Sequence, residues 1–275
     1  MTPLENALAR LETRWGSAAV RVGRMAEQRP HGALALVPEA AESEPRPIER
    51  ATDGLTSGLP ALDALLGPIG LPHAAAASLR GAGSSGKTTL ALYWLARAQA
   101  QGAIAAYLDL GRSFDPLEAA SRGVDLRWLL VLRPADPDEG FALAAALLGG
   151  RGIELLVVDL PDRLPVRLDA SLRRLAAHAH RVGARLIILE PTRLAGRLHG
   201  ALAEAVGLRL ELEQHGWLRL GRDIVGRRIG VSVAKNRFGP PGRRAEVEVH
   251  YLPEGELGPP ITALLEARAR AAPAA

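Results

Sequence analysis

Short apolar runs alternate with segments of helical periodicity through the middle of the chain. The runs have the length of buried strands, and the segments between them carry apolar residues at three- and four-residue spacing. The predicted strands are Ala74–Leu79, Ala103–Asp109, Leu129–Leu132, Ile153–Leu160 and Leu186–Leu189. The predicted helices are Leu59–Leu66, Lys87–Gln101, Asp138–Leu148 and Leu168–Arg181. Strands that alternate with helices form βαβ units, so we predict an α/β fold with a mostly parallel, twisted sheet and helices on both faces.

The pattern changes after residue 200, where strand-like runs are separated only by turns. These predicted strands are Val206–Glu213, Trp217–Gly221, Arg228–Ala234 and Glu246–Tyr251. Strands joined by short turns pair antiparallel, and we therefore expect them to extend the sheet toward the C-terminus.

The N-terminal segment has the pattern of a separate amphipathic helix over residues 2–15. Thr2 and Glu5 fit a capping box at its start, and Gly16 is suited to end it. Its apolar face packs either on the chain's own domain or on a neighbouring subunit, and the pattern leaves both open. The residues of that face are Leu4, Leu8, Leu11 and Trp15.

The chain divides into four parts by composition. Residues 1–25 hold the predicted N-terminal helix and a strand. Residues 26–54 are rich in Pro, Glu and Ala, which predicts a linker with at most a short strand at Ala33–Val37. Residues 55–255 form the predicted core. Residues 256–275 form a tail, with a short helix at Ile261–Arg270 before a disordered end.

Composition limits the chemistry available. Hydrophobic residues make up 48% of the 275 residues, enough for a substantial core. The absence of cysteine excludes disulfides, thiolate zinc sites and Cys nucleophiles, and it suits the reducing cytoplasm, where we expect the protein to act. No apolar run is long enough for a membrane span. The net charge of +4 comes with 32 Arg, which favour polyanions, although a genome biased toward Arg is the preferred explanation of the total.

A glycine-rich loop gives the strongest functional signal. Gly81–Thr88 reads GAGSSGKT and fits G-x-x-x-x-G-K-[ST], between a predicted strand and a predicted helix. Lysine is scarce, since the chain has only Lys87 and Lys235. We expect Lys87 to contact the outer phosphates of a nucleotide and Thr88 to bind Mg²⁺. The predicted nucleotide-binding residues are Gly81, Ala82, Gly83, Ser84, Ser85, Gly86, Lys87, Thr88 and Thr89.

A second element supports this site. The apolar run from Leu155 to Val158 ends in Asp159. A carboxylate at the carboxyl end of a strand completes the Mg²⁺ shell in nucleoside triphosphatases. We therefore predict Asp159 and Thr88 as the metal-binding pair.

Beyond these motifs, the chain resembles the RecA recombinase family over residues 2–25 and 52–255. The segments that carry the resemblance are LENALARLETRWG, LTSGLPALDALLGPIGLP, YLDLGRSFDPLEAASRGVDLRWLL, ELLVVDLPDRLP and GVSVAKNRFGPPGRRAEVEVHY. The resemblance implies a RecA-like core that binds ATP and Mg²⁺, an N-terminal helix that joins subunits into a homo-oligomer, and contact with single-stranded DNA.

The chain departs from that family at three functional positions. Gly111 stands where active members carry the glutamate that polarises the attacking water, and Glu118 replaces the aromatic residue that stacks on adenine. Glu190 and Pro191 replace the Asn-Gln pair that senses the γ-phosphate. We predict no catalytic residue, with one alternative: Asp109 lies two residues before Gly111 on the same strand face and could orient the water instead.

Other positions fit the family's contacts to a neighbouring subunit and to DNA. Lys235 and Arg237 match its two cations that reach the neighbouring subunit's nucleotide, although an ordinary charge at a strand end explains Lys235 as well. The two DNA-binding loops are shortened to about 161–167 and 192–200. Basic pairs elsewhere (Arg227 with Arg228, Arg243 with Arg244) are taken as surface residues. The DNA-binding candidates, which could equally be solvated loop residues, are Arg163, Arg167, Arg193 and Arg197.

The combined profile keeps a phosphate cradle and loses hydrolytic and switching groups. It is most similar to the ImuA-type accessory paralogues of bacterial mutagenesis cassettes, and it also suits other degenerate RecA-like proteins. The resemblance implies an ATP-binding protein of DNA repair and SOS mutagenesis that assists RecA or a translesion polymerase and hydrolyses ATP weakly or not at all. Two alternatives stay open: an active ATP-dependent recombinase that binds single-stranded DNA, and an interaction module that binds no nucleotide.

Overall fold

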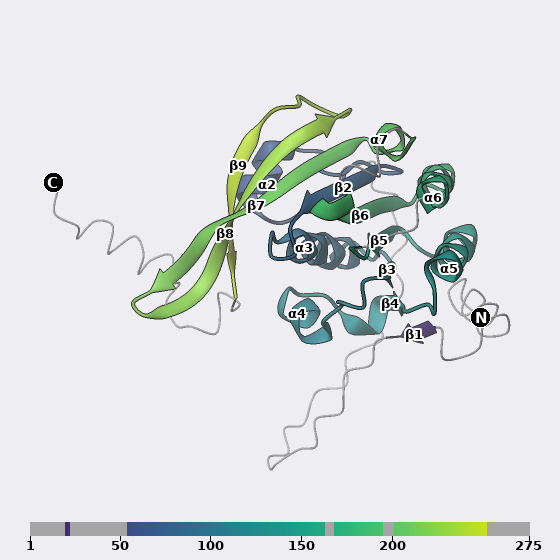
Figure 1. The fold of residues 1–275 in the computed structure, drawn as a ribbon, viewed down its shortest axis with the longest axis horizontal. Coiled ribbons are helices and arrows are strands. Elements are labelled where there is room, and N and C mark those ends of the chain that lie inside the picture. Colours follow the sequence, from purple (N-terminus) through teal and green to yellow (C-terminus); the bar gives the residue numbers. More distant parts are fainter. Residues whose placement is uncertain (1–19, 23–53, 163–167, 195–200, 252–275) are drawn as a thin grey trace, which may run out of the picture.

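The computed structural model describes residues 20–22, 54–162, 168–194 and 201–251. Within these ranges the strands form one nine-stranded sheet in the order β1-β4-β3-β5-β6-β2-β7-β8-β9 (Figure 1). The strands are β1 (Val20–Val22), β2 (Ala76–Gly81), β3 (Ala105–Asp109), β4 (Leu129–Leu132), β5 (Leu155–Asp159), β6 (Arg185–Pro191), β7 (Leu208–Leu220), β8 (Asp223–Asn236) and β9 (Arg244–His250).

The six strands from β4 to β7 in the sheet are parallel. β1 pairs antiparallel with β4 at one edge, and β8 and β9 pair antiparallel beyond β7 at the other. The fold class predicted from the sequence is therefore confirmed. The N-terminal helix, the linker and the C-terminal tail lie outside the described residues, as does the strand predicted at Ala33–Val37.

Helices cover both faces of the sheet, as predicted. One apolar core joins the sheet to α2, α3 and α4, and a second joins its opposite face to α5 and α6 (Figure 1). The bounds are α2 (Pro60–Leu66), α3 (Lys87–Ala100), α4 (Pro116–Ser121), α5 (Pro137–Gly149), α6 (Leu168–Val182) and α7 (Ala201–Ala205). No helix in the described ranges is long and apolar enough to cross a membrane.

The antiparallel strands expected after residue 200 are confirmed, but the prediction wrongly divides one of them into two. Val206–Glu213 and Trp217–Gly221 were expected as separate strands, but β7 runs without a break through 13 residues. Gln214 and Gly216 stay paired with β8 on either side of His215, where the register shifts. A bulge of this kind accommodates an extra residue without ending the ladder.

The strand register brings four loops to one edge of the sheet. Gly81 lies beside Pro191 on neighbouring strands, and Asp109 lies beside Asp159. All four positions are at the carboxyl ends of parallel strands. Ligands of open α/β sheets bind at this edge, so the fold assembles the predicted site from distant parts of the sequence.

Candidate functional site

The loop between β2 and α3 has the backbone geometry of a phosphate cradle. Gly86 has a φ of +94°, and a Cβ there would lie 2.3 Å from Ile229 Cδ1. A Cβ at Gly81 would lie 2.2 Å from Ser85 Oγ. Glycine is therefore required at both positions. α3 begins at Lys87, so the first N–H groups of a 14-residue helix point toward the loop.

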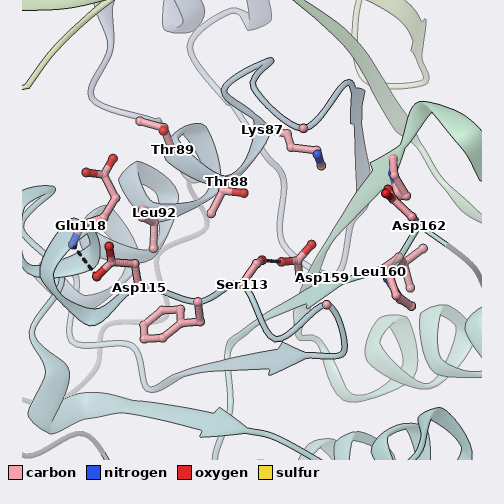
Figure 2. Close-up of a pocket in the computed structure, with 15 residues that line it drawn as sticks. Lys87, Thr88, Thr89, Leu92, Ser113, Asp115, Glu118, Asp159, Leu160 and Asp162 are labelled. Carbon is pink, nitrogen blue, oxygen red and sulfur yellow. Dashed lines mark hydrogen bonds between the residues drawn. The ribbon is translucent and has the colours of Figure 1, made fainter.

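A pocket of about 700 Å³ opens beside this loop at the carboxyl edge of the sheet (Figure 2). This volume lies within the range of small-molecule sites. Loop residues, α3, the segment after β3, the end of β5 and the end of β6 all contribute to it. Its lining residues are Gly83, Lys87, Thr88, Thr89, Leu92, Gly111, Ser113, Phe114, Asp115, Glu118, Asp159, Leu160, Pro161, Asp162 and Pro191.

Lys87 lines this pocket with only 7% of its surface exposed. Its Nζ donates a hydrogen bond to the Ala82 carbonyl at 3.2 Å. Burial lowers the pKa of Lys87, and the nearby charges of Asp159 and Asp162 act in the opposite direction. An anion bound in the loop would likewise favour the charged ammonium.

Asp159 lies at the end of β5 with 4% of its surface exposed. Its Oδ2 accepts hydrogen bonds from Ser113 Oγ at 2.5 Å and from Tyr107 Oη at 3.1 Å (Figure 2 shows the bond to Ser113). Burial raises the pKa of Asp159, although both hydrogen bonds lower it. The carboxylate is therefore costly to keep charged in the absence of a cation.

Two observations fit a nucleotide bound together with Mg²⁺: an oxygen pair suited to the metal, and an unpaired hydroxyl in the loop. Thr88 and Asp159 offer a hydroxyl and a carboxylate oxygen, and Mg²⁺ prefers to take one or two protein oxygens together with phosphate and water. No cluster of three or more His, Asp or Glu suited to a metal occurs in the described ranges. In the loop itself, Ser85 Oγ is buried without a hydrogen-bond partner among the described residues.

We expect Asp159→Asn to stabilise the nucleotide-free protein at neutral pH. Because the folded pKa of Asp159 is raised above 3.8, the unfolded chain loses this proton at lower pH, and the penalty on folding grows as pH rises through the folded pKa. Thermal unfolding of both proteins between pH 3 and pH 8 tests this. The stability of the variant should match that of the wild type at the acid end and exceed it near neutrality. A deficit at neutral pH would contradict the expectation.

Gly111 lines the same pocket, and a Cβ placed on it would lie 3.6 Å from Asp159 Oδ2. The position therefore faces the pocket, but it carries no group that could polarise water. The alternative role for Asp109 is not supported. Its carboxylate is ion-paired with Arg133 at 2.8 Å and accepts hydrogen bonds from the Ser113 and Phe114 amides. These bonds hold the turn after β3 and leave Asp109 outside the pocket lining.

Glu118 lines another part of the pocket, and it forms an ion pair where the RecA family has an aromatic residue. Glu118 Oε1 accepts a hydrogen bond from Arg122 at 2.9 Å. The Arg122 guanidinium lies 5.8 Å from the ring centre of Tyr93 and 6.0 Å from that of Tyr251. Asp115 caps α4 by accepting from the Leu117 and Glu118 amides. The Glu118 side is thus polar and held by its neighbours.

Pro191 lines the pocket, and Glu190 is fully buried at the end of β6. Glu190 accepts from Ser78 Oγ, pairs with Arg80 at 3.4 Å and lies 3.9 Å from Arg209. Its charge is committed to this network on β2 and β7. Neither residue offers an amide side chain to a ligand.

The structure does not bring Lys235 and Arg237 to the pocket of their own chain. Lys235 lies where β8 pairs with the start of β7, near the amino ends of the parallel strands, and its Nζ donates to the Ala203 carbonyl. Arg237 lines a separate pocket of about 250 Å³ beside α6 and α7. The contact with a neighbouring subunit's nucleotide stays a prediction.

The candidate DNA-binding arginines are placed only in part. Arg193 is exposed in a short 3₁₀ turn after β6 (Thr192–Leu194). Arg163, Arg167 and Arg197 lie outside the described residues. The DNA-binding hypothesis therefore stays a prediction.

One residue of the site was missed by the sequence-based reasoning, which took Arg227 as a surface residue. Its guanidinium donates to the Ser84 carbonyl at 3.2 Å and to Thr89 Oγ1 at 2.5 Å. Alternation along β8 could have found it. Val225, Arg227 and Ile229 share one strand face, and both neighbours are buried.

Comparison with known proteins agrees with this geometry. The family model of the RecA N-terminal domain matches residues 43–167. "Protein RecA" of Lactiplantibacillus pentosus is 32% identical over 226 residues, covering 72% of this chain and 60% of that protein. "Protein RecA" of Methylococcus capsulatus is 30% identical over 240 residues, covering 76% and 69%. "Protein RecA" of Francisella tularensis subsp. novicida is 29% identical over 276 residues, covering 90% and 71%.

The family model covers the glycine loop, β3 and β5, which form much of the pocket. The chain spans about 60% of the length of the Lactiplantibacillus relatives. Sequence similarity, the sheet order and the loop at its carboxyl edge lead to one assignment: the chain belongs to the RecA family.

Proposed function

We propose that this protein binds ATP with Mg²⁺ in the pocket beside α3 and hydrolyses it slowly or not at all. One observation carries the proposal: a complete phosphate cradle lies next to Gly111 and Pro191. Binding needs the loop amides, Lys87 and an oxygen set for the metal. Hydrolysis also needs a group that orients water, and neither residue has one.

The proposed residue roles follow from the geometry. Loop amides from Gly81 to Gly86 surround the phosphates, and Lys87 turns from the Ala82 carbonyl toward the outer phosphates. Thr88 and Asp159 hold Mg²⁺, which would neutralise phosphate charge when bound. Bound phosphate and Mg²⁺ would favour the charged forms of Lys87 and Asp159, which burial alone disfavours.

In the cell, we infer an accessory role in bacterial DNA repair and SOS mutagenesis, of the ImuA type. The fixed Glu190 network supports this inference, because it leaves no amide at the end of β6 to report the γ-phosphate. The partners we propose are RecA or a translesion polymerase, with single-stranded DNA as a further candidate. The N-terminal helix is the proposed contact for homo-oligomers.

The proposal predicts tight ATP binding with little turnover. Equilibrium binding of a fluorescent ATP analogue and steady-state phosphate release are to be measured on the same preparation, with and without single-stranded DNA. We expect saturable, Mg²⁺-dependent binding and a turnover that DNA does not stimulate. Turnover comparable to that of an active recombinase, rising with single-stranded DNA, would overturn the proposal.

The two alternatives give different results in the same experiments. An active recombinase would also carry out strand exchange, but the engaged Asp109 offers no substitute for the missing glutamate. An interaction module without nucleotide would show no saturable binding at all. Failure of the ATP analogue to bind therefore separates the module from both nucleotide-binding functions.

A further inference from the structure

Arg227 is the one arginine of β8 that contacts the glycine loop in the described structure. Its Nη1 donates to the Ser84 carbonyl within the loop, and its Nη2 donates to Thr89 Oγ1 on the first turn of α3. A Cβ placed at Gly86 would lie 3.7 Å from the Arg227 Cζ. A permanent positive charge thus lies directly against the phosphate cradle.

The contacts leave part of the guanidinium unused. Arginine carries five N–H donors, and the two bonds to Ser84 and Thr89 use two of them. The Arg227 Nε is buried and has no hydrogen-bond partner among the described residues. A buried donor without a partner is unfavourable, so the contacts within the chain do not fully satisfy this guanidinium.

Thr89 fixes which part of a ligand Arg227 would meet. Thr89 lines the pocket one residue beyond Thr88, and Leu92 continues the lining along α3 toward Asp115 and Glu118. In Figure 2, Thr89 lies on the Glu118 side of Lys87, away from Asp159 and Asp162. Because Lys87 and Asp159 are the proposed contacts of the outer phosphates and Mg²⁺, a phosphate that reaches the Thr89 hydroxyl is the one nearest the sugar.

We propose that Arg227 supports nucleotide binding at the sugar-proximal phosphate, through its positive charge and through its hydrogen bond to Thr89, the pocket-lining residue that would hold that phosphate. This rests on the proposed function of the pocket. An oxygen hydrogen-bonded to Thr89 would lie within about 5 Å of the guanidinium, close enough for opposite charges to interact strongly. β8 would thus supply a cation to the cradle from outside the glycine-loop motif. All nucleoside di- and triphosphates share this phosphate. Arg227 would therefore strengthen the binding of both classes without discriminating between them.

The test compares Arg227→Gln, Arg227→Lys and Arg228→Gln for equilibrium binding of ADP and ATP analogues. Arg228 is the matched control, since it is exposed and pairs with Glu246 and Glu248 instead. We expect Arg227→Gln to weaken the binding of both analogues by the same factor, about tenfold, because it removes one charge-assisted interaction. Arg227→Lys should recover most of the loss, and Arg228→Gln should bind as the wild type does.

Thermal unfolding without nucleotide separates binding from a purely structural latch. If Arg227 only ties β8 to the loop, Arg227→Gln will lower the unfolding midpoint and leave both affinities unchanged, which overturns the inference. A wild-type protein that binds no nucleotide would overturn this inference and the proposed function together. Wild-type binding with an unaffected Arg227→Gln would overturn this inference alone.

Discussion

Lys87→Ala is expected to weaken ATP binding about 100-fold, the largest loss that a single substitution in this chain should cause. A hydrogen bond between charged groups contributes about 1.5–3 kcal/mol, and Lys87 can bridge two phosphates. The expected loss equals roughly 2.8 kcal/mol. The substitution should not lower the stability of the nucleotide-free protein, because burial disfavours the charged ammonium and lowers its pKa. Titration of a fluorescent ATP analogue measures the effect.

Lys235→Ala is the natural control, since these are the chain's only two lysines. Lys235 lies near the opposite edge of the sheet and contacts Ala203. The Lys235→Ala substitution should leave nucleotide binding by the isolated subunit unchanged. Equal affinity of Lys87→Ala and wild type would show that the loop does not hold phosphates, and the nucleotide-binding proposal would fall.

Gly111→Glu is expected to raise ATP turnover about 100-fold over wild type, since a positioned general base contributes about 10²–10⁴-fold. The site has room for the side chain. The nearest atoms to a Cβ at Gly111 are Asp159 Oδ2 at 3.6 Å and Ser113 Oγ at 3.7 Å. The new carboxylate would enter the pocket beside Asp159, the proposed metal ligand. Phosphate release under saturating Mg²⁺ and ATP measures the gain.

Two controls make this result specific. Gly111→Gln fills similar space without a carboxylate and should leave turnover near the wild-type rate. Without Mg²⁺, Gly111→Glu should unfold at a lower temperature than Gly111→Gln, because two carboxylates then repel each other in the pocket. If turnover stays within threefold of the wild type although ATP still binds, the missing glutamate does not limit hydrolysis.

Much of the fold could be predicted because its central strands are continuous apolar runs. Strands such as Leu155–Asp159 are buried on both faces, and that leaves a strong signal in the sequence. The glycine loop was equally clear, since its motif fixes both a turn and a chemistry. Asp159 followed from its position at the end of such a strand. These features depend on local sequence alone.

The errors arise where distant pairing decides the structure. Gln214 to Gly216 resemble a turn, but hydrogen bonds to β8 hold them in one long strand. The six-residue α4 is too short for periodicity to reveal, and its start depends on Asp115 accepting from two amides. The sequence leaves Asp109 available for catalysis, but in the structure its carboxylate pairs with Arg133, which is 24 residues away. Arg227 required knowledge of which strand face meets the loop.

The buried Glu190 also bears on which substitutions the end of β6 tolerates. Its carboxylate is fully buried and faces Arg80 and Arg209. Removing one partner of such a cluster costs about 3–5 kcal/mol, a large part of a domain's stability. A single replacement of Glu190 by an amide is therefore expected to destabilise the fold. A tolerated replacement would require coordinated changes on β2, β6 and β7, so stability rather than contact with a ligand constrains the residue at this position.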